Sequence, residues 1–119
     1  MTRVSIRTLS GLGLIAVAAC AGAPEPTERL VSAQSALRAA KEVGVTQVPQ
    51  AQLHVQLAQE QLERAQRLIA DGENERADWV LRRATADAEL AVALAREAQA
   101  KDAAEQATAA LKTEGSSVK

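Results

Sequence analysis

The 119-residue sequence has no phenylalanine, no tyrosine and a single tryptophan, although 47% of its residues are apolar. Much of that apolar content is alanine, which buries little area per residue, so a core built from it gains little stability. We therefore expect a fold that is marginal on its own and is helped by association or anchoring. The net charge is −1, which gives nucleic acid no electrostatic reason to bind.

Residues that carry chemistry are also scarce. A single cysteine, Cys20, excludes an internal disulfide, and with one histidine, His54, it is too little for a usual zinc site. There is no glycine-rich phosphate loop, and the serines have no general base near them in the sequence. We therefore expect no catalytic residue, cofactor or metal, predict that the protein is not an enzyme, and place His54 on the exposed surface.

The longest apolar run spans residues 9–19 and is shorter than the roughly 20 residues that a membrane-spanning helix needs. Arg3 and Arg7 precede it, and small residues end it. A basic start, a short apolar stretch and a small-residue end are typical of an export signal. We predict that residues 1–19 are a signal peptide.

The run ends in Val17-Ala18-Ala19-Cys20, which resembles the bacterial lipobox. The resemblance implies that Cys20 receives lipid, that cleavage occurs before it, and that residues 20–27 form a lipidated tether. Since Ala21 is not the aspartate that commonly retains lipoproteins in the inner membrane, it also implies the periplasmic face of the outer membrane. The alternative is a soluble secreted protein that is cut after an Ala-x-Ala site such as Ala21-Gly22-Ala23.

The mature part is patterned as helix. Apolar residues recur at spacings of three and four, and glycine or proline interrupts the pattern, which predicts helices at about 28–43, 50–71 and 75–112. Gly72 suits the left-handed position after the second helix, and Asn74 suits the N-cap of the third. The buried seam of the third helix is predicted to comprise Ala77, Leu81, Ala84, Ala88, Ala91, Ala95 and Ala98.

The apolar arc around that seam covers close to half of the third helix, which is wide enough to contact two helices. We therefore predict an all-α fold, an alanine-rich antiparallel bundle of three helices. The alternative is a long hairpin whose first arm is kinked and follows the whole third helix.

The far end of the third helix is patterned differently. Asp102 and Glu105 interrupt the seam, and the apolar face reappears rotated, ending at Leu111. A stripe that changes direction does not serve the same core. We expect this end to fray into a flexible tail at 113–119, and the alternative makes Leu111 a contact with a partner.

Trp79, near the start of the same helix, either closes the hairpin end of the bundle or presents its ring to a partner, and packing is the role we expect. The pairs Asp78 with Arg82 and Arg83 with Asp87 are each four residues apart. That spacing predicts ion pairs on a solvated face.

The segments "AQSALRAAKEVGV" and "LAQEQLERAQRLIADGENERADWVLRRATADAELAVALAREAQA" resemble the alanine-rich bacterial lipoproteins called domain of unknown function 4398. The likeness covers about residues 30–105, with Gly44 and Pro49 at the first helix break and Gly72 at the second. The family has no assigned activity. Some of its members precede a peptidoglycan-binding domain, which implies a place in the cell envelope.

Together these features predict an outer-membrane lipoprotein with a structural or protein-interaction role. Its expected partners are the membrane, through Cys20, and an envelope protein or a second copy of the chain. The alternative is a tether joined to peptidoglycan through Lys119, because the major murein lipoprotein is also small and helical with a C-terminal lysine.

Overall fold

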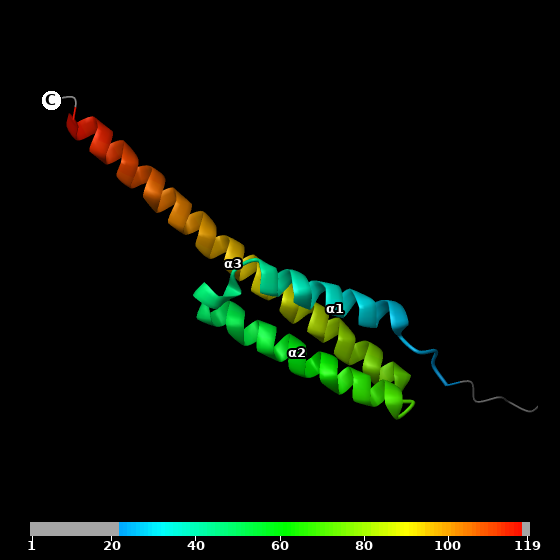
Figure 1. The fold of residues 1–119 in the computed structure, drawn as a ribbon. Coiled ribbons are helices and arrows are strands. Elements are labelled where there is room, and N and C mark those ends of the chain that lie inside the picture. Colours follow the sequence, from blue (N-terminus) through cyan, green and yellow to red (C-terminus); the bar gives the residue numbers. More distant parts are fainter. Residues whose placement is uncertain (1–21, 118–119) are drawn as a thin grey trace, which may run out of the picture.

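The structure is a computed structural model that describes residues 22–117. Within that range it contains α1 (Thr27–Glu42), the single-turn 3-10 helix η1 (Val45–Gln47), α2 (Pro49–Ala70) and α3 (Asn74–Ser117). Helices α1 and α2 both lie along the first half of α3, and the second half of α3 projects beyond them (Figure 1). The prediction of an all-α, three-helix bundle is confirmed.

The direction of α1 excludes the long-hairpin alternative. Arg29, near the start of α1, bonds Asp78 near the start of α3, with 3.1 Å between Nε and Oδ1. After the end of α1, the Val43 carbonyl accepts a hydrogen bond from Gln99 Nε2 at 2.8 Å. Helix α1 therefore runs parallel to α3 from the level of residue 78 to that of residue 99, beside α2 rather than as its extension.

Alanine forms most of the core. All but the last of the predicted seam residues of α3 are buried, and Ala98 is half-buried where the bundle ends. Leu81 is the largest side chain that is fully buried. Because methyl groups let backbones approach closely, tight packing offsets part of the area that larger side chains would bury. The buried residues are Ala33, Leu37, Ala40, Val45, Ala51, Ala58, Ala65, Leu68, Ala77, Leu81, Ala84, Ala88, Ala91 and Ala95.

The turn between α2 and α3 is a Schellman motif, as the placement of Gly72 predicted. Gly72 has φ +76°, its N–H bonds the Ile69 carbonyl at 3.0 Å, and the Glu73 N–H bonds the Leu68 carbonyl at 2.8 Å. The N-cap prediction was one residue late. The Glu73 carbonyl accepts the first bond of α3, from Ala77 N–H, so Asn74 lies inside the helix and its amide is free to bond elsewhere.

Helix α3 extends to Ser117, so the prediction that this end frays is wrong for residues 113–117. Residues 118 and 119 lie outside the described range. The last fully buried residue is Ala95, and residues 99–116 are all exposed. At 1.5 Å per residue, α3 therefore projects about 33 Å past the core.

Candidate functional site

A partly buried group of polar side chains joins α2 to α3. His54 Nδ1 lies 2.9 Å from Asp87 Oδ1, and Gln61 Nε2 donates to Asp87 Oδ2 at 2.7 Å. The side chains of His54 and Asp87 are only 24% and 21% exposed, so the prediction of an exposed histidine is wrong. His54 and Gln61, both on α2, each bond one carboxylate oxygen of Asp87 on α3, and this arrangement holds the two helices in register.

The same contacts replace one predicted ion pair. The predicted pair of Arg83 with Asp87 does not form, because Asp87 bonds His54 and Gln61 of α2 instead. Arg83 makes no ion pair in the described part of the chain. The pairing of Asp78 with Arg82 is confirmed, with 2.7 Å between Oδ2 and Nε. Asp78 also accepts from Arg29, and this carboxylate links α1 to α3.

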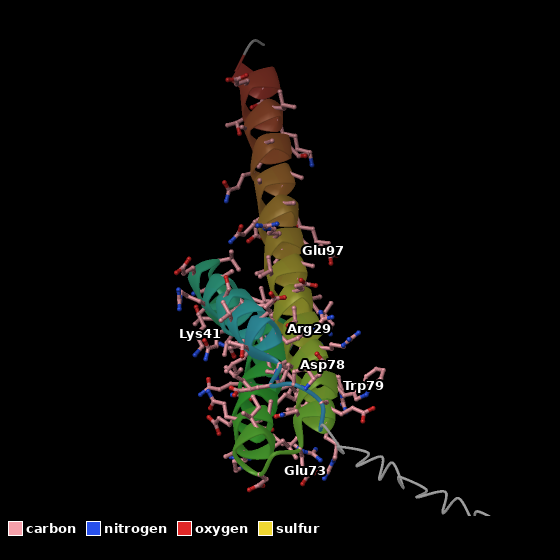
Figure 2. All side chains as sticks on the ribbon, turned by 90° about the vertical axis from the view of Figure 1, so that its right-hand side faces the viewer. Arg29, Lys41, Glu73, Asp78, Trp79 and Glu97 are labelled. Carbon is pink, nitrogen blue, oxygen red and sulfur yellow. The ribbon has the colours of Figure 1, made fainter. Side chains whose placement is uncertain are left out.

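Trp79 does not pack into the bundle. Its side chain points away from the helices (Figure 2) and the residue is 62% exposed, which corrects the expectation of a packing role. The Arg82 guanidinium lies 5.3 Å from the ring centre, a cation–π contact. Such contacts are worth about 0.5–1 kcal/mol at exposed sites, so the ring is oriented but not covered.

The N-terminal segment is held at the hairpin end of the bundle. Asn74 Nδ2 donates to the Ala23 carbonyl at 2.7 Å, while Asn74 Oδ1 is buried without a hydrogen-bond partner. The segment before α1 therefore lies beside the turn that joins α2 to α3. The projecting end of α3 points the other way (Figure 1).

A groove of about 560 Å³ lies between α1 and α3. Its apolar walls include Val31, Ala36 and Val92, and its rim carries Glu89 and Arg96. Neither charged residue has an ion-pair partner among residues 22–117. The groove is open to solvent, and its lining includes Ala93 on the exposed side of α3.

The structure brings two of the predicted site residues to one surface. Trp79 and Leu111 are both exposed on α3, at 62% and 70%, near its two ends. Cys20, the lipobox residues Val17, Ala18 and Ala19, and Lys119 lie outside the described residues.

Two further features of the described residues concern metal binding and insertion into a membrane. Within residues 22–117 there is no cluster of three or more side chains that could hold a metal ion. In the same range no helix is both long enough and apolar enough to cross a bilayer.

The matched family is described as "Domain of unknown function (DUF4398)", and the match covers residues 28–107. The chain belongs to this family. The match begins one residue into α1 and ends within the projecting part of α3, so the DUF4398 domain comprises the bundle and about half of the projection. No curated protein and no solved structure matches the chain.

Proposed function

We propose that this DUF4398 protein is an outer-membrane lipoprotein whose helical domain is a protein-interaction element of the cell envelope. The observation that carries the proposal is the sequence Val17-Ala18-Ala19-Cys20 at the end of a short apolar run that follows two arginines. The described residues support an interaction role, because the long exposed side of α3 carries large apolar side chains, among them Trp79 and Leu111.

The contact between Asn74 and Ala23 indicates which end of the bundle would lie near the membrane. Cys20 precedes Ala23 by three residues, which span at most about 10 Å of extended chain. A lipid on Cys20 would hold the hairpin end of the bundle close to the bilayer, with the projecting end of α3 directed away from it. Two or three acyl chains on one residue suffice for stable anchoring.

Lipid labelling tests the anchor. Cells that express the wild-type chain in the presence of labelled palmitate should yield a labelled protein in the membrane fraction. Cys20→Ser should lose both the label and the membrane association, while Thr2→Ser, a matched hydroxyl change in the signal, should keep them. A Cys20→Ser chain that stays labelled and membrane-bound would refute the proposal.

Fractionation tests which membrane holds the protein. The wild-type chain should enter the outer-membrane fraction, and Ala21→Asp should divert it to the inner membrane. Equal distribution of the two variants would refute the outer-membrane assignment without affecting the lipid.

A second candidate function is covalent attachment to peptidoglycan through Lys119. The projection of α3 supports it, because the helix carries the chain away from the end that holds Ala23. Sacculi boiled in detergent should retain the protein, and deletion of Lys119 should release it. Lys112→Arg, a change at an exposed lysine of α3, should leave the attachment intact. Release of the wild-type chain would refute this candidate.

A further inference from the structure

The outer side of α3 carries a regular apolar pattern that no other described segment covers. Of five large apolar residues that are strongly exposed, Trp79, Leu90 and Leu111 all lie on this side of α3. Spacings of four and three residues alternate between Trp79 and Leu111, which is the heptad pattern of helices that pair along a seam. We call this the outer seam, and it comprises Trp79, Arg83, Ala86, Leu90, Ala93, Glu97, Ala100, Ala104, Ala107 and Leu111, all exposed.

Only two residues of the outer seam are charged, and their placement is self-complementary. Arg83 and Glu97 have opposite signs and lie seven residues before and after Leu90. In a parallel pair of α3 helices each charge would meet its own copy, which is repulsive. In an antiparallel pair each Arg83 lies within one helical turn of a Glu97, so both charges are matched.

We propose that the outer seam binds a second copy of this chain in antiparallel orientation, with the two-fold axis between Leu90 and Ala93. A two-fold interface uses the same patch on both copies, as a self-complementary charge pattern requires. The proposal concerns the described helix alone and does not depend on lipidation of Cys20.

The edge of the outer seam repeats the charge pattern. Glu89 and Arg96 flank it on the groove side, with opposite signs and on opposite sides of the proposed axis, each within about one and a half helical turns of it. The antiparallel arrangement brings each Glu89 to the partner's Arg96. Glu97 bonds Lys101 within its own helix at 2.7 Å, and both side chains are well exposed, so this pair is worth little and does not hold Glu97 away from a second copy.

Side-chain size fits the same register. Leu90 lies opposite the partner's Ala93, and Trp79 lies opposite the partner's Ala104, so each of these two large side chains meets a small one, while Leu111 lies just beyond the overlap of the two helices. Layers that alternate large and small residues fill the space between two helices without voids. This register also covers the first half of the projection, where the residues beyond Gln99 are exposed and bond no other described segment of their own chain.

The extent of the interface sets how tightly the copies bind. Residues 74–109 of the two helices overlap, which gives a strip about 52 Å long and about 10 Å wide. The total buried area is then about 1,000 Å², near the lower limit for a specific interface. We therefore expect an association that depends on concentration, and a covalent cross-link is the suitable way to detect it.

Cysteine cross-linking of the full chain in cells tests the proposal. Ala93→Cys lies beside the axis and should yield a dimer at twice the monomer mass with a short bifunctional maleimide. Ala107→Cys lies on the same seam, but the antiparallel register separates the two copies of this residue by about 45 Å, so it should stay monomeric. The unmodified chain controls for linkage through Cys20.

Each alternative to antiparallel pairing predicts a different set of cross-linked products from these two variants. Dimers with both variants would show parallel pairing, and dimers with neither would show that the seam does not bind a second copy. A cross-linked product of Ala93→Cys with another mass would assign the seam to a different protein. Each of these three results would overturn the proposal.

Charge exchange provides an independent test in the Ala93→Cys background. Arg83→Glu places two carboxylates together and should greatly reduce the cross-linked fraction. Adding Glu97→Arg reverses both signs and should restore it, because the exchanged charges again match. Both residues are exposed, so the bundle should fold in each variant. Failure of the double variant to recover would refute the assigned register.

Discussion

We expect the stability of the bundle to depend more strongly on Leu81 than on any other described side chain, because it is the largest one that is fully buried. It is fully buried in α3, in a cluster whose other buried members are the alanines Ala33, Ala65 and Ala84. Alanine has no side-chain torsion through which it could fill a space left behind, so only the partly buried residues at the edge of the cluster, such as Leu62 and Ile69, could move to close part of a cavity at this position.

The magnitude follows from the atoms removed. Leu81→Ala deletes three carbon groups, at about 0.8 kcal/mol each for transfer from water, and the unfilled cavity raises the total to about 4 kcal/mol. Domains of this kind are stable by about 5–15 kcal/mol, so the variant loses a large share of its stability. The loss corresponds to a decrease in Tm of about 15–30 °C.

Urea denaturation followed by far-UV circular dichroism measures this change. The matched control is Leu53→Ala, the same substitution at a residue of α2 that is 53% exposed, and it should shift the midpoint only slightly. If the two variants lost similar amounts of stability, full burial of Leu81 would not be what makes this position sensitive, and the reasoning would be wrong.

Three further predictions concern other parts of the chain. His54→Ala removes the bond to Asp87 and should lower the free energy of unfolding by about 1–2 kcal/mol in urea denaturation, with His54→Phe no better because it restores no hydrogen bond. Gly72→Ala forces a side chain into φ +76° and should cost about 1–2 kcal/mol, whereas Gly115→Ala, in the projecting helix, should add helical signal and leave the bundle's midpoint unchanged; the reverse order would contradict the turn geometry. Trp79 is exposed, so its native fluorescence maximum should lie close to that of the urea-unfolded chain, and a strongly blue-shifted native emission in the monomer would show a buried ring.

The sequence predicted the helices well because alanine recurs at the positions of each helix that face the other helices and are buried. The predicted seam of α3 coincides with its buried face as far as Ala95, and Gly72 lies at the predicted turn. Burial periodicity does not report where a helix stops once it leaves the core. The backbone hydrogen bonds of a helix do not need a neighbouring helix to form, and α3 contains no glycine between Asn74 and Gly115 that would end it.

Contacts between helices were harder to predict than the helices. Trp79 was expected to pack against the bundle, but α1 and α2 pack toward one side of α3 and leave Trp79 exposed. His54 and Asp87 are 33 residues apart, and no local pattern relates them. The predicted lipid site at Cys20 precedes the described residues and stays a prediction.

The projecting part of α3 is already helical, which reduces the conformational entropy that is lost when a molecule binds to it. Starting a helix is the unfavourable step, because the first turn fixes several backbone torsions for one hydrogen bond, whereas extending it is nearly neutral for each residue. Packing fixes residues 74–95, so the bundle acts as a permanent nucleus and residues 98–117 only propagate an existing helix. Any molecule that binds there meets a preformed rod and loses little affinity to ordering it.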